Sequence, residues 1–375
     1  MENIQVTRRR RPQREKLTVK QIVLRSILVF FTVILLLVAA LCMVCGLIFN
    51  GPSESARDVL TMSMLESSGM KWFPAIFIGQ DTVDQIQSNI SATLPNDISG
   101  SDSVIIQPGN DLTSEEWKDH PDGVRIEYVS GDTYNAYVML IRDPSAVYMA
   151  TSTEKFSTSI PGERIHNQIY KEGAIAAINA GAFFDNGTSS SVVGSVPQGL
   201  VIAGGTVRWE SGSAPEKGFV GFNQNNILVV AKEMTGEKAL ELGIRDGCCF
   251  GPVLIMDGVI NEEAYNSNSG YNPRTAIGQR SDGTVLFVCI DGRQAGSLGG
   301  AYKDIIDIMT EYGAVNACNL DGGSSTVMLY KDTYGKYSGN VIIGDDIKMI
   351  NNYSLLQAEP RRMPTFFMVR PNSED

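Results

Sequence analysis

Three clusters of polar residues, each at one end of an apolar run, could do chemistry in this 375-residue chain. Arg274-Thr275 begins one such stretch, Asp291-Gly-Arg293 follows the run 285–290, and Asn319-Leu-Asp321 opens a glycine- and hydroxyl-rich segment. Two carboxylates can exchange protons or stabilise a cationic centre, and a guanidinium can bind an oxyanion. Polar residues at the ends of buried strands are typical of a site, because catalytic groups need a rigid scaffold beneath them and open space in front.

The segment Asp-Gly-Gly-Ser-Ser-Thr at 321–326 is the most informative of the three. Two glycines let the backbone turn sharply and approach a ligand, while successive N–H groups and three hydroxyls supply donors for an anion or a sugar. The alternative is a glycine-rich turn between two strands, capped by Asp321. The candidate binding residues here are Asn319, Gly322, Gly323, Ser324, Ser325 and Thr326.

The other two clusters, and a further motif at 179–181, are more indicative of function together than each is alone. Asp291-Gly292 alone is typical of an ordinary turn, but a second Asp-Gly unit one helix later favours function. Arg274 could bind a phosphate through two parallel hydrogen bonds, a geometry that lysine lacks, or form a structural ion pair. Asn179-Ala-Gly181 ends another apolar run and could supply an amide, or it is simply a strand end beside packed aromatic residues. The catalytic candidates are thus Asp291, Asp321 and Arg274, and Asn179, Gly181 and Thr275 join the binding candidates.

Composition argues against several other kinds of site. The chain has only two histidines, His120 and His166, and neither stands beside another cluster, so a Ser-His-Asp triad or a multi-histidine zinc site is not expected. The six cysteines form neither a disulfide framework nor a Cys-x-x-Cys metal motif, and the adjacent pair Cys248-Cys249 suggests no mechanism. Acid–base work therefore falls to carboxylates.

The elements around the clusters predict how they meet. The run 285–290, a helix at about 300–312 and the run 315–320 form a strand–helix–strand unit. A right-handed crossover would make the two strands parallel neighbours and bring Asp291 and Asp321 out at the same edge of the sheet. Elsewhere, hairpins and few helices predict an α+β fold with a mixed, largely antiparallel β-sheet.

The N-terminus predicts a membrane anchor. Residues 26–49 are 24 residues without a charge, which as a helix would span about 36 Å, enough to cross a hydrocarbon core of about 30 Å. Eight Lys or Arg residues against two Glu precede them, and this bias places residues 1–25 in the cytoplasm. A cleaved signal peptide is the alternative, but the run is long and no Ala-x-Ala pattern follows it. We therefore expect a single-pass protein of the cell membrane, with a lipid bilayer around residues 26–49 and the main domain outside the cytoplasm.

Charge and composition divide the rest of the chain. Of 31 basic and 42 acidic residues, 23 and 40 lie beyond residue 25, so this part carries a net charge of −17. An acidic ectodomain argues against nucleic acid as a partner, because phosphate chains bind clustered Lys and Arg. Residues 50–122 combine a helical segment with a stretch rich in Ser, Asp, Asn, Gly and Pro, which predicts a stalk and linker. The main domain is expected at 123–375.

Taken as a series, the motifs resemble those of the phosphodiester glycosidase family. The matching segments are Asn179-Ala-Gly181, Arg274-Thr-Ala-Ile-Gly278, Asp291-Gly292 and Asn316-Ala-Cys-Asn-Leu-Asp-Gly-Gly-Ser324, in that order. The set is specific although each motif alone is not, and Ala182 departs from the family pattern. The family includes the uncovering enzyme, which removes N-acetylglucosamine from a sugar-1-phosphate diester on lysosomal enzymes. The anchor and linker resemble those of bacterial membrane-bound members, often labelled exopolysaccharide biosynthesis proteins.

The resemblance implies a glycosidase that hydrolyses the C1–O bond of a sugar-1-phosphodiester in an envelope glycan or exopolysaccharide. Our hypothesis gives Asp291 and Asp321 the roles of base, nucleophile or oxocarbenium stabiliser, assigns the phosphate to Arg274 and the 322–326 donors, and lets Asn179 and Asn319 orient the sugar. No cofactor is required, and the carboxylates could hold a divalent cation although no spacing demands one. Two alternatives stay open: a non-catalytic glycan-binding or scaffold module of polysaccharide assembly, and a metal-dependent phosphodiesterase that breaks the P–O bond.

Overall fold

A computed structural model describes residues 18–65, 70–88, 94, 96–100, 104, 115–184, 194–212, 218–343, 346–352 and 359–371. The chain divides into one unit that ends at Ser53 and a second that runs from Glu54 to Asp375. In the first unit, helix α1 (Val19–Phe49) is the one helix of the described ranges that is long and apolar enough to cross a membrane, a test that a signal sequence also passes. It begins before the expected residue 26, because Thr18 caps its first turn by accepting from the backbone N–H of Gln21.

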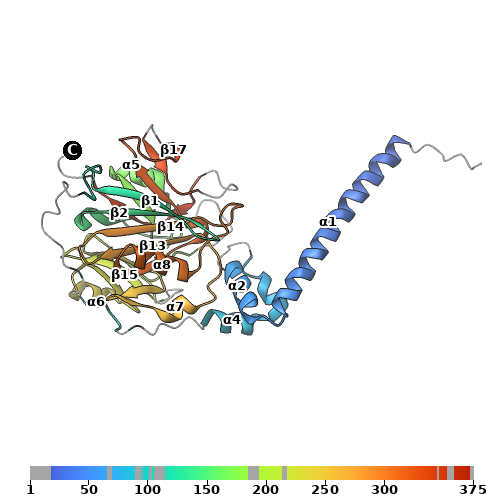
Figure 1. Ribbon diagram of the computed structural model, residues 1–375, viewed down its shortest axis with the longest axis horizontal. Coiled ribbons are helices and arrows are strands. Elements are labelled where there is room, and N and C mark those ends of the chain that lie inside the picture. The colour runs from blue at the N-terminus through green and yellow to red at the C-terminus, as the bar shows by residue number, and fades with distance from the viewer. Residues whose placement is uncertain are drawn as a thin grey trace, which may run out of the picture. The chain divides into compact units, whose positions relative to one another are not determined.

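In the part of the second unit that the structure describes, three large antiparallel sheets form the body (Figure 1). The sheet that carries most candidate residues has the strand order β1 (Val124–Ser130), β2 (Asn135–Ile141), β14 (Val285–Ile290), β13 (Arg274–Arg280), β15 (Ala314–Leu320), β11 (Val253–Met256) and β12 (Val259–Ile260). Helix α8 (Tyr302–Glu311) packs on one face of this site sheet. The predicted α+β class with largely antiparallel sheets and few helices is confirmed.

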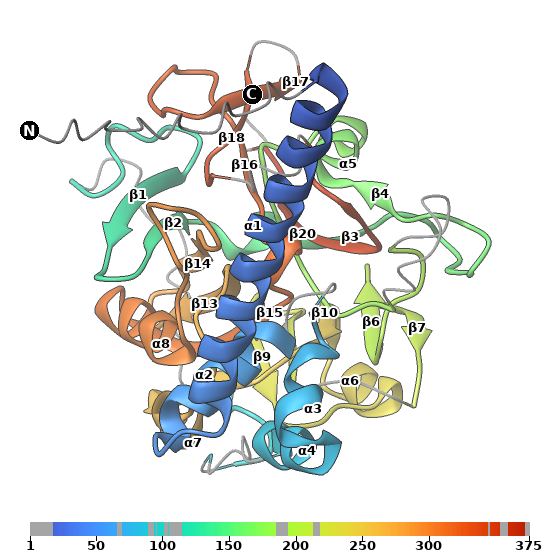
Figure 2. The ribbon, with the colours of Figure 1, turned by 90° about the vertical axis from the view of Figure 1, so that its right-hand side faces the viewer.

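Two further sheets complete the body, and strands of both, among them β6, β7, β3 and β20, are labelled in Figure 2. One has the order β7 (Thr206–Glu210), β6 (Leu200–Ala203), β10 (Ile244–Cys249), β8 (Phe219–Asn223) and β9 (Leu228–Ala231). The other has the order β17 (Asn340–Ile343), β18 (Ile347–Met349), β16 (Met328–Lys331), β5 (Ala176–Asn179), β20 (Thr365–Val369) and β3 (Val147–Thr151), and a short ribbon pairs β19 (Arg362–Met363) with β4 (Glu163–Arg164). The remaining helices are α2 (Glu54–Leu65), α3 (Phe73–Ile78), α4 (Gln80–Ser88), α5 (Ile165–Glu172), α6 (Gly236–Glu241) and α7 (Glu262–Asn266).

Alternation along β14 shows how the core is built. Val285, Phe287 and Cys289 join a cluster shared with the other two sheets, while Leu286, Val288 and Ile290 pack with α8 on the opposite face. Side chains of a strand alternate between the two faces, so an unbroken apolar run is the pattern of a strand buried on both sides. The strand is therefore fixed firmly enough to position the aspartate at its end.

The predicted adjacency of the two strands before the aspartates is wrong. Strand β13 lies between β14 and β15 and pairs antiparallel with both, with Arg274 opposite Ile290 and Thr275 opposite Leu320. Sequence order suggested that β14 and β15 are direct neighbours. Instead β13, which precedes both in the chain, lies between them and forms hydrogen bonds with each. Since β14 and β15 still run in the same direction, Asp291 and Asp321 do leave the sheet at the same edge, one on each side of β13.

Parts of the segment that the sequence assigns to a stalk and linker pack on the sheets. Ser55 Oγ donates to Asn268 Oδ1 at 3.0 Å, which places the start of α2 on a loop of the main body. Farther along, Ile98 forms an isolated bridge with Ala231 of β9, and Trp117 is buried in the cluster under α8. The compact body therefore includes residues on the N-terminal side of the expected boundary at 123.

Candidate active site

Asp291 follows β14 directly and is buried, with 1% of its surface exposed. Its Oδ1 accepts from the backbone N–H of Asn352 at 3.0 Å, and its Oδ2 accepts from the side-chain amide of Asn352 at 3.1 Å. The amide of Asn351 donates to Oδ1 at 3.4 Å. Burial raises the pKa of Asp291 to about 6, although these hydrogen bonds oppose the shift. A carboxyl group that titrates near neutrality can take or give a proton under physiological conditions.

Asp321 is held at its backbone by a buried network. Its N–H donates to Ala180 O at 3.0 Å, and its carbonyl accepts from the side-chain amide of Asn179. The amide oxygen of Asn179 accepts in turn from Thr275 Oγ1 at 2.8 Å and from the N–H of Val327 at 3.2 Å. Asn179 and Thr275 therefore tie β5, β13 and the loop after β15 together beneath Asp321, whose own side chain is only partly buried. Sugar binding by these two residues stays a prediction, but their hydrogen bonds fit a supporting role.

The loop after Asp321 folds into a short 3-10 turn at Gly323–Ser325. The N–H of Gly323 donates to Pro273 O at 2.8 Å, and the N–H groups of Ser325 and Thr326 bond within the turn. A Cβ on Gly322 would lie 2.7 Å from Pro273 O, so only glycine allows this approach. The expected row of backbone donors is thus largely used within the fold. The hydroxyls of Ser325 and Thr326 are buried and have no hydrogen-bond partner among the described residues, so their hydrogen-bonding capacity is unused there.

Arg274 is buried, and its guanidinium is bonded to backbone carbonyls of the fold. It is 2% exposed; its Nε donates to Gly300 O at 3.0 Å, and its Nη2 donates to the carbonyls of Ser269 and Gly270 at 2.8 and 3.1 Å. The guanidinium also lies 4.4 Å from the ring centroid of Tyr302 on α8. Three of its N–H bonds are thus committed to backbone carbonyls. The sequence suggested a phosphate clamp because it shows an arginine but not which carbonyls surround it.

Replacing Arg274 with lysine should destabilise the fold by about 2–3 kcal/mol, because an ammonium cannot reach three carbonyls in the fork geometry of a guanidinium. Thermal unfolding of the full chain measures the effect. Arg293→Lys is the matched control: Arg293 is exposed and donates through Nη2 to a side-chain oxygen, Asn272 Oδ1 at 2.9 Å, a bond that does not need three donors in fork geometry. Equal melting temperatures for the two variants would contradict the structural role.

A second arginine, Arg361, lies beside the loop. Its Nη1 donates to Ser324 Oγ at 3.1 Å, and its guanidinium lies 4.8 Å from the ring centroid of Phe183. Arg361 is partly exposed, and it precedes β19 near the start of the C-terminal strand pair. Its guanidinium thus places a cation beside the hydroxyl of Ser324.

Gly181 and Asn319 lie deeper in the fold. A Cβ on Gly181 would lie 2.9 Å from Cys248 Cβ, so this glycine permits the close packing of β10, and the vicinal cysteines, both free thiols, supply the packing surface. The side-chain amide of Asn319 donates to Gly251 O at 2.9 Å, while its Oδ1 is buried without a partner among the described residues. Asn319 can therefore still accept one hydrogen bond from a ligand or water.

Sequence reasoning missed the partners that come from distant segments. Asn351, Asn352 and Arg361 lie well beyond the Gly-Gly motif, and no apolar run leads directly into them. The chain returns through β16 and β18 before it reaches Asn351 and Asn352, and Arg361 lies directly before β19. An Asn-Asn pair carries little signal by itself, because such pairs are common in turns. As for metal ions, the described ranges contain no group of three or more His, Cys, Asp or Glu side chains placed to hold one.

Comparison with known proteins supplies the remaining context. A family model described as phosphodiester glycosidase matches residues 172–370. A prophage-derived uncharacterised protein, YomE, of Bacillus subtilis strain 168 is 26% identical over 235 residues, which are 61% of this chain but only 34% of that protein. The catalytic domain of zebrafish N-acetylglucosamine-1-phosphodiester alpha-N-acetylglucosaminidase, auto-inhibited by its pro-peptide, shares the fold with a TM-score of 0.50 at 18% identity, covering 66% of this chain and 82% of that one. A hypothetical protein from Synechocystis aligns with a TM-score of 0.40 at 17% identity, covering 66% and 62%.

Proposed function

Because this chain belongs to the phosphodiester glycosidase family, we propose that it hydrolyses a sugar-1-phosphodiester at the glycosyl C1–O bond. Family membership supports a glycosidase-type hydrolase; the bond that is broken and the residues that act are our proposal. The observation that carries it is Asp291, a buried carboxyl group with a pKa near 6. It lies at the same sheet edge as a loop where two hydroxyls have no partner among the described residues and a third contacts an arginine. A carboxyl group that exchanges protons near neutral pH and a neighbouring loop with an arginine that could bind an anion suit a phosphorylated sugar as substrate.

In the proposed reaction, Asp291 acts as the general base. It accepts a proton from water while the water oxygen attacks C1, and the C1–O bond breaks so that the electron pair leaves with the phosphomonoester. A phosphate is a good leaving group, which reduces the need for a strong general acid and lets a carboxyl group of raised pKa serve as the base. Asp321, whose backbone is fixed by Asn179, stabilises positive charge at the sugar ring.

For the phosphate we propose Arg361 and the hydroxyls of Ser324, Ser325 and Thr326 in place of Arg274. Arg361 already donates to Ser324 Oγ, and the other two hydroxyls have no partner among the described residues. Cation and donors fixed before the reaction stabilise the charge that grows on the leaving phosphate. Arg274 keeps an indirect role by holding the loop that precedes β13.

We also propose that α1 anchors the protein in a membrane with the main domain outside the cytoplasm. The length and apolar composition of α1 and the basic residues before it support this arrangement. An extracytoplasmic position would give access to phosphoglycans of a cell envelope or to exopolysaccharide, and we propose these as the substrate class. The proposed domain organisation has an N-terminal tail at 1–25, the anchor at 26–49, a segment at 50–122 and the catalytic domain at 123–375, with parts of the 50–122 segment packed on the catalytic domain.

The test is release of free sugar from UDP-N-acetylglucosamine or from a synthetic glycosyl-1-phosphodiester by the full chain in detergent. Carried out in oxygen-18 water, C1–O cleavage places the label on the sugar. Label on the phosphate, with activity lost to a chelator, would instead identify a metal-dependent phosphodiesterase. Binding of polymer without turnover, unchanged by Asp291→Asn and Asp321→Asn, would identify a glycan-binding module.

A further inference from the structure

The loop 268–273 lies between helix α2 and the candidate active site. On the α2 side, the N–H of Tyr271 donates to Ser63 Oγ at 3.1 Å, and Ser55 Oγ donates to Asn268 Oδ1 at 3.0 Å. Gly270 has φ +75°, and a Cβ at this position would lie 2.6 Å from Ser63 Oγ and 2.7 Å from Ser63 N. The loop backbone therefore rests directly on the α2 backbone, at a contact that only glycine allows.

The same loop supports the site on its other side. Pro273 O accepts from the N–H of Gly323 at 2.8 Å, so the turn that follows Asp321 is built on the last residues of the loop. Arg274 grips the carbonyls of Ser269 and Gly270, and Ser269 Oγ accepts from the N–H of Tyr302 at the start of α8. A displacement of Pro273 would therefore be passed to Gly323, while Arg274, Tyr302 and a bridge between Asn272 and Gly300 hold the loop from this side.

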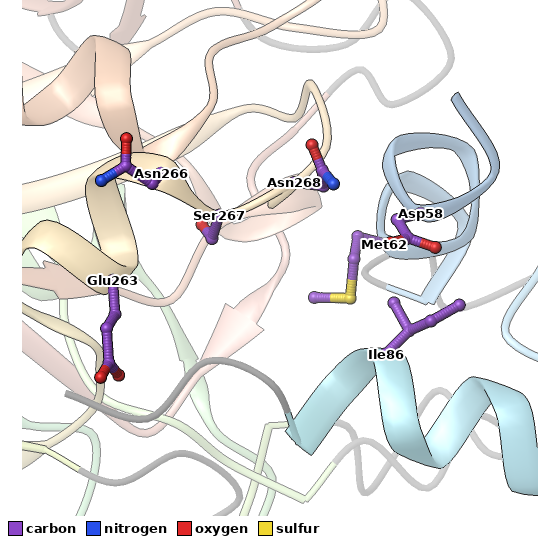
Figure 3. Close-up of a pocket in the computed structure, with 7 residues that line it drawn as sticks. All are labelled: Asp58, Met62, Ile86, Glu263, Asn266, Ser267 and Asn268. Atoms are coloured by element: carbon purple, nitrogen blue, oxygen red, sulfur yellow. The ribbon is translucent and has the colours of Figure 1, made fainter. Parts of the chain in front are cut away.

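The contact between α2 and the loop is narrow. Beside it lies a cavity of about 240 Å³, lined by Asp58 and Met62 of α2, Ile86 of α4, and Glu263, Asn266, Ser267 and Asn268 (Figure 3). In Figure 3 the side chain of Ile86 points toward Met62, and Ser267 and Asn268 lie on the opposite side of the space. Since the cavity separates the helices from α7 here, α2 meets the loop through the contacts at Ser55, Ser63 and Gly270.

We propose that α2 is a positioning element of the active site: its contact at Ser63 and Gly270 sets the loop 268–273, and this loop sets the turn at Gly322–Gly323. The effect on catalysis rests on the proposed function; the mechanical coupling does not. Helix α2 lies outside the residues 172–370 that match the family model, so catalysis would depend on a segment that the family motifs do not contain.

The test compares Gly270→Ala with Gly258→Ala in the full chain. Both glycines have a positive φ, +75° and +77°, so both variants carry the same backbone strain, but a Cβ at 258 meets nothing within 4 Å. We expect Gly270→Ala to lower kcat roughly ten- to a hundredfold with little change in KM, and to speed amide hydrogen exchange at both Tyr271 and the 321–327 turn. Ser63→Ala removes the acceptor of the Tyr271 N–H, together with the bond from Ser63 Oγ to Val59 O within α2, and should give the same pattern in weaker form if Gly270→Ala fails to fold.

Hydrogen exchange tests the coupling between α2 and the 321–327 turn separately from the proposed hydrolysis. Faster exchange at the 321–327 turn in Gly270→Ala or Ser63→Ala, but not in Gly258→Ala, supports the coupling even if the wild type releases no sugar, in which case only the proposed function fails. Unchanged exchange at that turn in both α2-contact variants overturns the coupling. So does a wild-type kcat in a Gly270→Ala protein whose Tyr271 amide exchanges faster.

Discussion

Replacing Asp291 with asparagine should lower kcat by about a thousandfold, while substrate binding changes little. The carboxylate is the proposed proton acceptor, and general-base catalysis by a positioned group contributes about 10²–10⁴-fold. Asparagine has nearly the same shape but no basic oxygen. Steady-state kinetics of sugar release, with kcat and KM determined separately, measure the effect.

The pH profile provides an independent check on Asp291. As a base it must be deprotonated, and its pKa is raised to about 6, so kcat/KM of the wild type should fall as the pH drops below about 6. Asp246→Asn is the matched control, because Asp246 is also buried, with its pKa raised by burial, but belongs to β10 of another sheet. A wild-type rate in Asp291→Asn, or a limb near pH 6 that survives the substitution, would contradict the assignment.

The same carboxyl group should make the free energy of unfolding depend on pH. The pKa of Asp291 is near 6 in the folded protein and about 3.9 in an unfolded chain, so the folded state holds the proton more tightly. This contribution stabilises the fold fully at low pH and is lost as the pH rises from about 4 to 6; two pKa units correspond to about 3 kcal/mol. The catalytic group is therefore held in its charged form at the expense of stability.

Replacing Arg361 with alanine should lower kcat/KM for a glycosyl phosphodiester by about a hundred- to a thousandfold. Arg361 and the hydroxyl of Ser324 are the proposed partners of the departing phosphate, and loss of one preoriented donor costs about 10²–10³-fold. The effect should depend on the leaving group. A neutral aryl glycoside of the same sugar develops no phosphate charge, so its hydrolysis should change much less. Kinetics with the two substrates measure this difference.

Arg362→Ala is the control for Arg361. The neighbouring guanidinium donates to Gly162 O at 3.0 Å and contacts Glu163 on the β4 strand, away from the 322–326 turn. Arg362→Ala should keep the discrimination between the two substrates. An equal loss with both leaving groups in Arg361→Ala would show that Arg361 supports the fold and does not bind phosphate.

The sequence predicted the candidate aspartates and their common sheet edge, because an apolar run ending in Asp-Gly is a local pattern. It could not predict that β13 separates their strands, since register and strand order are set by contacts across the whole domain. Nor could it distinguish the two arginines. Arg274 stands in a family motif yet faces carbonyls, whereas Arg361 stands in no motif and reaches Ser324 only after the chain returns to the six-stranded sheet.

Residues 97–99 bond to the edge strand β9, and this contact bears on the association of one molecule with another. Lys232 N–H donates to Asp97 O and Ser99 N–H donates to Val230 O, both at 2.9 Å, so this short stretch occupies hydrogen-bonding groups on the outer strand of its sheet. Removing everything before residue 123 would bare those groups, and an unpaired outer strand is a template for intermolecular strand addition. The stretch that composition alone marks as a linker thus covers part of an edge strand of the body.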